Sequence, residues 1–479
     1  MGAHHSFGGD TGRRHAHAPR HRHTHRPAGA LLVALVVVMA TAAGALGLAA
    51  RRRTHEPAPN VAAAGAGYWV SVHGDDESGA GTPDRPWRSV EHAVRTVPPG
   101  SRIFLRAGRY QPFIVDRAGL TVTSAPGERA TIVGRAGIRD VVRVTAANVS
   151  LIDVTVTGCV PKANPDVNVT GDHGSGIRVD RTTGVVIRGV TVRDSHGVNA
   201  SGLPVGCYGI LATSARDLRV TGCDVSHNGA GIVVSRGGRG VLVDNNNVHD
   251  QDVIIQNTRA SLDDFGGYGL AASFVTDDPG PVFRGNTVQH NIGPSADYGV
   301  DGGGVEIYDA ANTTVTGNTF ADNNGVLETG TGSSGRCEND AFTGNTVAVR
   351  GHAKQQSHFT GLVLRCSADM TISHNTFEGL SNFTFLVSAA GPFAGAVDQL
   401  KISDNTVSQA PEAVVFRLQY PSTDSLPALV VDRNRYHLSR EAFAVLGPDT
   451  ESAAEDLANT VSFSTWRKRT RFDGDSSLQ

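Results

Sequence analysis

One pattern recurs along the chain between residues 185 and 436, in which apolar residues alternate with polar residues on both sides of a polar pair. Alternation with a period of two predicts short β-strands, whereas helical repeats would show a period near 3.6. Self-similarity at a spacing of about 23 to 40 residues predicts a solenoid of strands joined by turns. The register marks of the nine copies are Val190, Cys223, Asn246, Asn286, Asn318, Asn345, Asn375, Asn405 and Asn434.

Asparagine occupies most of these marks, and we interpret it through backbone geometry. Asparagine tolerates the left-handed conformation that a sharp corner between two strands requires. We therefore expect these residues to adopt that conformation and to stack into a ladder in which each satisfies the next. Cys223 stands where the other copies carry asparagine, which predicts a buried free thiol.

A second strand precedes each repeat and usually begins with glycine, so that each turn of the solenoid contains about three strands. We call this series the Gly-led strands. They are GIRVD (176–180), GILAT (209–213), GIVVS (231–235), GLAAS (269–273), GVEIY (304–308) and GLVLR (361–365).

With these motifs the chain resembles the right-handed parallel β-helix proteins of the pectin-lyase-like superfamily, and more narrowly a group of exported bacterial members without an assigned activity. The opening YWVSVHGDDESGAGTPDRPWRSVEHAVRTVPPGSRIFLRAGRY is similar to that of many secreted polysaccharide lyases and hydrolases of this fold. The resemblance implies a strand and a short helix that cap the solenoid. Independently, one apolar face could cover the open end of the stack, formed by Val90, Ala93, Val94 and Val97.

The expected fold class is therefore all-β, a right-handed parallel β-helix over residues 67–440 with a short helical N-terminal cap, preceded by one transmembrane or signal helix. Residues 441–479 are expected to form a C-terminal capping tail. In this tail REAFAVLG (440–447) predicts a short helix over the end of the solenoid, and Trp466 is expected to pack there.

The N-terminal part of the chain predicts export. Residues 1–27 form a polar tail with seven histidines, residues 28–50 contain no charge, and residues 51–66 form a linker. A run of 23 uncharged residues is long enough to span a bilayer, which favours a retained anchor over a cleaved signal. Five arginines before the run and three after it place the N-terminus in the cytoplasm and the rest outside. Signal cleavage with secretion is the alternative.

The net charge and the isoelectric point of the chain limit the kinds of molecule that it is expected to bind. A net charge of -3 and a pI of about 6.7 provide no basic surface for nucleic acid, so none is expected. The resemblance implies a polysaccharide or an envelope glycan instead, and we expect a monomer. Five cysteines fit an exported chain. Equivalent positions on neighbouring coils predict a disulfide between Cys337 and Cys366, and shared placement in insertions predicts a second between Cys159 and Cys207.

Insertions at 193–208, 249–268 and 289–303 should wall a groove along the Gly-led strands. If Val305, Ile307 and Leu327 point inward, Glu306 and Glu328 lie outward on adjacent rungs about 4.8 Å apart. Two carboxyl groups at that spacing suit an acid and base pair for glycosidic-bond cleavage, and the spacing suits a retaining mechanism. We predict Glu306, Glu328 and Asp301 as catalytic.

Residues expected to contact the substrate surround this pair: Asp263, Asp264, Asp297, Tyr298, Tyr308, Lys354 and Arg365. Two alternatives stay open. In a lyase, Ca2+ held by the acidic cluster would neutralise a uronate while Lys354 or Arg365 removes a proton. In a non-catalytic glycan-binding or structural protein, Glu306, Glu328 and Arg365 would form a solvated charge ladder that discourages sheet association. Asp250 and Asp252 are predicted Ca2+ ligands, although a turn built from aspartate fits equally well.

Overall fold

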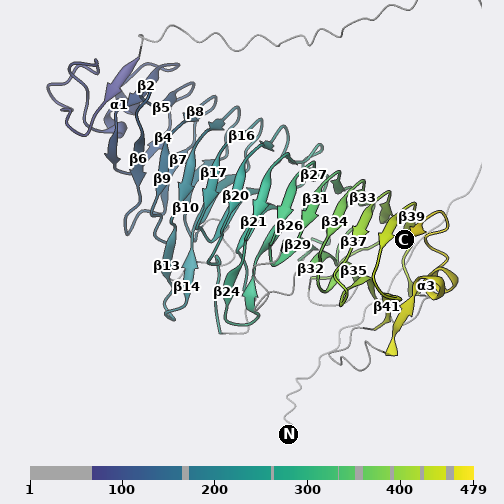
Figure 1. Ribbon diagram of the computed structural model, residues 1–479. Coiled ribbons are helices and arrows are strands. Elements are labelled where there is room, and N and C mark those ends of the chain that lie inside the picture. The colour runs from purple at the N-terminus through teal and green to yellow at the C-terminus, as the bar shows by residue number, and fades with distance from the viewer. Residues whose placement is uncertain are drawn as a thin grey trace, which may run out of the picture. The chain divides into compact units, whose positions relative to one another are not determined.

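The computed structural model describes residues 67–163, 165, 172–259, 264–332, 334–350, 360–388, 393–420, 425–448 and 458–479. Three sheets of 13 strands each run along the described chain, and strands of successive coils pair in parallel except at the last pair of one sheet. Each coil contributes one strand to each sheet, so the predicted solenoid with three strands per turn is confirmed (Figure 1).

Sheet A contains the strands that begin each repeat. They are β1 (Tyr68–Val70), β2 (Arg102–Leu105), β5 (Thr121–Ser124), β8 (Ser150–Ile152), β11 (Val186–Arg188), β16 (Arg219–Thr221), β19 (Leu242–Asp244), β22 (Val282–Arg284), β27 (Thr314–Thr316), β30 (Ala341–Thr343), β33 (Thr371–Ser373), β36 (Lys401–Ser403) and β39 (Val430–Asp432).

Sheet B contains the strands that follow the register marks. They are β3 (Gly108–Tyr110), β6 (Ala130–Val133), β9 (Thr155–Thr157), β12 (Thr191–Arg193), β17 (Asp224–Ser226), β20 (Asn247–His249), β23 (Thr287–Gln289), β28 (Thr319–Ala321), β31 (Thr346–Ala348), β34 (Thr376–Glu378), β37 (Thr406–Ser408), β40 (Arg435–His437) and β43 (Ser477–Leu478).

Sheet C contains the Gly-led strands. They are β4 (Phe113–Val115), β7 (Asp140–Val144), β10 (Ser175–Asp180), β15 (Tyr208–Thr213), β18 (Ala230–Ser235), β21 (Tyr268–Ser273), β26 (Gly303–Tyr308), β29 (Gly325–Gly330), β32 (Thr360–Leu364), β35 (Phe383–Ser388), β38 (Val414–Gln419), β41 (Ala442–Gly447) and the antiparallel β42 (Thr460–Ser462).

Two inserted hairpins lie between sheets B and C in the sequence and extend from the same side of the stacked coils (Figure 1). One pairs β13 (His196–Val198) with β14 (Pro204–Gly206), and the other pairs β24 (Gly293–Ser295) with β25 (Gly299–Asp301). Side chains that point into the coils form the core, where valine and isoleucine dominate the first half and stacked aromatic rings the second. Phe320 and Phe342 are 5.7 Å apart between ring centroids, and Phe342 and Phe377 are 6.5 Å apart.

The asparagine ladder exists, but the predicted conformation of its members is wrong. The left-handed residue is the one before each asparagine, for example Gly285 at φ +64° and Asp404 at φ +59°. Asn286 itself is buried; its Nδ2 donates to the Val243 carbonyl at 3.0 Å and to Asn318 Oδ1 at 2.9 Å. The preceding residue makes the corner, and the asparagine satisfies the buried backbone behind it.

A second ladder, which the sequence analysis missed, follows sheet B. It consists of Asn228, Gln251, Asn291 and Asn323, and each member after the first accepts a hydrogen bond from the backbone N–H of the member before it. The signal was present in the sequence as an amide residue two positions after each strand, again preceded by a residue with positive φ.

Both ends of the solenoid are covered. Helix α1 (Val90–Thr96) buries Val90, Ala93 and Val94, as predicted. At the C-terminus the predicted helix over 440–447 is wrong, because this segment forms β41 and adds a further rung to sheet C. Helix α3 (Phe463–Thr470) provides the cover, and its fully buried Trp466 stacks on Phe416 at 4.6 Å.

The cysteine predictions are confirmed. Disulfides join Cys159 to Cys207 and Cys337 to Cys366, and Cys223 is a buried free thiol. Burial raises the pKa of the Cys223 thiol to about 11. The predicted membrane segment 28–50 lies outside the described residues. Within the part that the structure describes, no helix is long and apolar enough to cross a membrane.

Candidate active site

One row of outward side chains runs along sheet C, and the strand register fixes its members. In coil order it contains Arg143, Arg178, Leu211, Val233, Ala271, Glu306, Glu328, Val363, Leu386, Arg417 and Val445. Glu306 pairs with Glu328 across β26 and β29, as the sequence predicts. Within this row, these two are the acidic residues, and they are neighbours.

Much of the row is covered. Leu211, Val233 and Ala271 are buried beneath a cluster to which Ile255 and Phe265 of the 249–268 insertion contribute. On the other side of the two glutamates, Leu386 and Val445 belong to a second apolar cluster. Glu306 and Glu328 therefore lie where the apolar cover is interrupted.

A groove of about 490 Å3 opens at this interruption. Among the residues that line it, those predicted from the sequence are Asp264, Tyr298, Asp301, Glu306, Tyr308, Glu328 and Arg365. The insertions 249–268 and 289–303 both contribute walls, as predicted. The third insertion, 193–208, does not line the groove; its hairpin packs against the 249–268 insertion, with Gly206 N donating to the Ile254 carbonyl at 2.9 Å.

Glu328 forms an ion pair with Arg365, and both side chains are partly exposed, 52% for the glutamate and 33% for the arginine. Glu306 is half-buried. Its negative charge, together with the larger effect of burial, raises the pKa values of Tyr208 and Tyr268. The two glutamates therefore occupy different surroundings, one beside a guanidinium and the other near two buried phenols.

Asp264 and Asp297 organise the wall of the groove. Asp264 is buried and accepts hydrogen bonds from Thr258 N at 2.6 Å and from the Ser295 hydroxyl at 2.8 Å. The single proton of this hydroxyl is shared with Asp297, whose Oδ1 lies 2.6 Å from the Ser295 oxygen. Burial raises the pKa of Asp264; for Asp297, hydrogen bonds from Ser295 and from the Asp264 backbone outweigh burial and lower the pKa. Through these hydrogen bonds, Asp264 and Asp297 fix the position of the β24–β25 hairpin, whose turn contains Tyr298.

Aromatic side chains border the groove. Tyr308 lies between Phe274 and Phe393, with centroid distances of 5.8 and 6.0 Å and nearly perpendicular rings. Tyr298 is exposed at 59%. Exposed aromatic faces offer a sugar ring an apolar surface to stack on. Phe393 is a groove residue that the sequence analysis missed; Asp263 and Lys354 lie outside the described residues.

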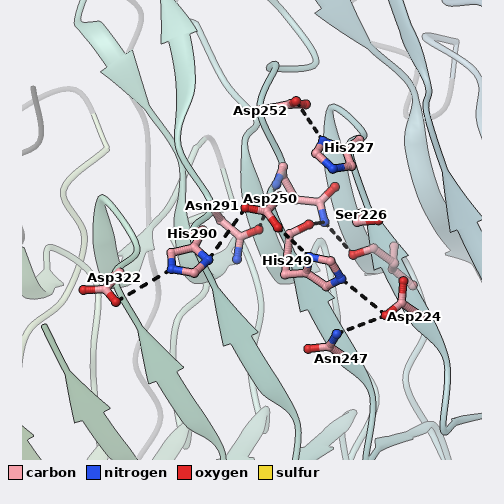
Figure 2. Close-up of polar contacts among 12 residues, drawn as sticks. Asp224, Ser226, His227, Asn247, His249, Asp250, Asp252, His290, Asn291 and Asp322 are labelled. Carbon is pink, nitrogen blue, oxygen red and sulfur yellow. Dashed lines mark hydrogen bonds and ion pairs between the residues drawn. The ribbon is translucent and has the colours of Figure 1, made fainter. Parts of the chain in front are cut away.

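Asp250 and Asp252 do not line the groove. Asp250 belongs to a row of alternating acids and histidines at left-handed corners where sheet B ends: Asp194, His227, Asp250, His290 and Asp322. Asp252 follows Asp250 by two residues and contacts His227 (Figure 2). The His249 Nδ1 is 2.6 Å from Asp250, and the His227 Nδ1 is 2.9 Å from Asp252, whose carboxylate raises the pKa of His227. Ca2+ takes oxygen ligands, whereas the partners of these carboxylates are imidazoles, so the geometry does not favour the predicted Ca2+ site.

Comparison with known proteins defines the class. The family model described as right handed beta helix region matches residues 141–347 and 259–419, which together are more than half of the chain. The chain therefore belongs to the right-handed β-helix family, as its repeats predicted. No curated protein sequence matches the chain.

Several solved structures are similar. The lacto-N-biosidase of family GH136 from Eubacterium ramulus shares 13% identity over 78% of this chain and 67% of that one, with a TM-score of 0.52. A family 28 exopolygalacturonase from Yersinia enterocolitica shares 12% over 86% and 78%, with a TM-score of 0.45. Pectate lyase Pel9A shares 13% over 73% and 76%, with a TM-score of 0.44. At such identities the first likeness shows a shared fold.

Proposed function

We propose that the protein cleaves glycosidic bonds of a polysaccharide or envelope glycan in the groove on sheet C. The observation that carries this proposal is the pairing of Glu306 with Glu328 on adjacent rungs at the floor of that groove. Two carboxyl groups flanking one bond are the usual catalytic set of glycoside hydrolases. The lacto-N-biosidase with a similar fold is consistent with a β-helix that supports such chemistry.

The different surroundings of the two glutamates suggest their roles. Glu328 contacts the Arg365 guanidinium, which favours a negatively charged carboxylate and suits a nucleophile or base. Glu306 is half-buried near Tyr208 and Tyr268, which suits the general acid. Adjacent rungs about 4.8 Å apart favour retention of the anomeric configuration, since inverting enzymes separate the carboxyl groups by about 6.5 to 9.5 Å.

Asp301 lies at the end of β25 on the groove wall and its Oδ1 accepts from Gly302 N at 2.7 Å. We assign it to substrate positioning beside Glu306, together with Tyr298 and Tyr308. In this scheme the role of Arg365 is to keep the Glu328 carboxylate negatively charged through their ion pair. That contact weakens the alternative in which Arg365 removes a proton from a uronate in a lyase.

The surroundings of the catalytic unit fit an exported enzyme. Two disulfides are typical of a chain that folds outside the cytoplasm. We therefore place the β-helix outside the cytoplasmic membrane, anchored through residues 28–50 with the N-terminus inside. A monomer suffices, because the groove is built from one chain.

The test is turnover of the purified full-length protein on a panel of neutral and uronic-acid polysaccharides, with reducing ends and ultraviolet absorbance recorded together. We expect new reducing ends without ultraviolet absorbance. Glu306→Gln and Glu328→Gln should each lower the rate at least about 100-fold while the circular dichroism spectrum is kept. The matched control is Glu378→Gln on the exposed face of β34, which should leave the rate unchanged.

Unchanged turnover in both groove variants would refute the proposal. An ultraviolet-absorbing product that requires a divalent cation would replace it with the lyase. A folded wild-type protein that binds a polysaccharide of the panel but releases no product would replace it with glycan binding.

A further inference from the structure

Three side chains from three successive coils converge on the flank of the solenoid, outside the groove. His196 begins β13 after the coil of β12, His227 follows β17, and Asp252 follows β20. The Asp252 carboxylate contacts both rings, with Oδ1 2.8 Å from His196 Nε2 and Oδ2 2.9 Å from His227 Nδ1. The contact between Asp252 and His227 is visible in Figure 2.

The geometry points to a binding site for a divalent transition-metal ion of the Zn2+ type, formed by His196, His227 and Asp252. One ligand atom from each residue lies within 4.8 Å of the other two. In a tetrahedral site with bonds of about 2.0 to 2.2 Å, ligand atoms are about 3.4 Å apart. The three side chains are between 42% and 46% exposed, so small rotations can close this difference without disturbing packed neighbours.

The ligand chemistry selects the class of metal. Two imidazole nitrogens and one carboxylate oxygen suit Zn2+, Co2+ or Ni2+, whereas Ca2+ and Mg2+ take oxygen ligands. Three protein ligands leave a position for water.

The two neighbouring histidines, His249 and His290, have a different arrangement of partners from His196 and His227. His290 lies between Asp250 and Asp322 at 3.7 and 3.8 Å, and His249 contacts Asp250 and Asp224. Each of these is one imidazole between carboxylates. Asp250 also has an imidazole on each side, but His290 is 3.7 Å away from it. Among the described residues, the set of three ligand atoms that lie within 4.8 Å of one another is the one formed by His196, His227 and Asp252.

The site lies between an inserted hairpin and the body of the solenoid. A bound ion would join the β13–β14 hairpin to sheet B. That hairpin is tied to the wall of the groove through Asn257, whose Nδ2 donates to the Pro204 carbonyl at 3.0 Å and to the Pro294 carbonyl of β24 at 2.9 Å. The ion would thus fix the base of the β13–β14 hairpin, where His196 pairs with Gly206, and its binding does not depend on the proposed hydrolase activity.

The histidine-rich tail would bind the same metals, so the test uses the full chain with the seven histidines of residues 1–27 replaced by asparagine. We call this chain the tail-free background. Titration with zinc chloride, followed by calorimetry, should show one ion per chain. His196→Asn, His227→Asn and Asp252→Asn should each lower the affinity at least about tenfold, and His290→Asn should not.

Two further readouts separate a specific site from a folding defect. Zn2+ should raise the melting temperature of the tail-free background and of His290→Asn, but not of His227→Asn. Co2+ should give the visible absorption of a tetrahedral ion in the same two proteins. Ca2+ at the same concentration should have no effect on melting.

The proposal is overturned if the tail-free background binds no Zn2+, or if its affinity is unchanged by all three ligand variants. Stabilisation by Ca2+ but not by Zn2+ would also overturn it.

Discussion

Asp340 is a buried carboxyl group in a row of the core that is otherwise uncharged. The residues immediately before successive sheet A strands stack on one another, and this row includes Thr313, Met370, Leu400 and Leu429 beside Asp340. Asp340 is 1% exposed. Its Oδ1 accepts from Thr313 N at 2.7 Å, and its Oδ2 is buried without a hydrogen-bond partner among the described residues.

Burial raises the pKa of Asp340 from 3.8 to about 8, and the nearby charge of Glu338 adds to the effect. The folded protein therefore holds a proton between these pH values that the unfolded chain releases, so stability falls as the pH rises. The contribution is fully present below pH 3.8 and is lost by about pH 8. At about 1.4 kcal/mol per pH unit, the loss approaches about 6 kcal/mol at most, and about 4 kcal/mol at pH 7.

The perturbation is Asp340→Asn, which removes the titration and keeps an oxygen for Thr313 N. We expect the variant to be more stable than the wild type at pH 7, by up to about 4 kcal/mol, and the difference to shrink toward zero near pH 4. The assay is urea unfolding of the full-length protein at several pH values between 4 and 8, followed by circular dichroism.

The control is Glu378→Gln, which removes an exposed carboxylate and should leave the pH profile unchanged. A difference between Asp340→Asn and wild type that stays constant from pH 4 to 8 would refute the reasoning, because it would show that Asp340 does not change protonation on unfolding.

Three further predictions concern stability of the full-length protein. Burial lowers the pKa of His173 to about 4, so its contribution is present above pH 6.5 and lost as the pH falls toward 4; His173→Phe should reduce the acid loss of unfolding free energy, measured with urea between pH 4 and 7, by up to about 3 kcal/mol. Asn318→Ala removes the buried hydrogen bonds that its side-chain amide makes with Asn286, Phe283 and Asn345 and should cost about 2 to 4 kcal/mol in urea unfolding, whereas Asn247→Ala on the partly buried outer face should cost less than half as much. Serine at both Cys337 and Cys366 should cost about 2 to 4 kcal/mol, and an unchanged melting temperature would contradict a folded-state bond there.

The fold was predictable because the repeat is visible in the sequence. Alternation of apolar residues identified the strands, and the recurrent asparagine fixed their register. That register then placed Glu306 beside Glu328, because side chains alternate between the two faces of a strand and the register therefore decides which of them share a face.

Other features were not predictable, for identifiable physical reasons. Asparagine and its predecessor both suit a sharp corner, and only the backbone shows that the left-handed residue is Gly285 rather than Asn286. The segment 440–447 is short and apolar, and such runs fit a strand and a buried helix equally well. The contact of His196 with Asp252 joins distant parts of the chain, which no local pattern encodes.

The placement of the two glutamates also bears on whether they are a site or a protective charge ladder. Charges on a sheet discourage association where a strand has an unpaired edge. Strands β26 and β29 are interior strands with parallel neighbours on both sides, so they have no such edge to protect. The same row is moreover apolar on both sides of the pair, at Ala271 and at Val363. Two like charges on adjacent rungs repel each other, which supports the proposal that the pair serves the chemistry of the groove.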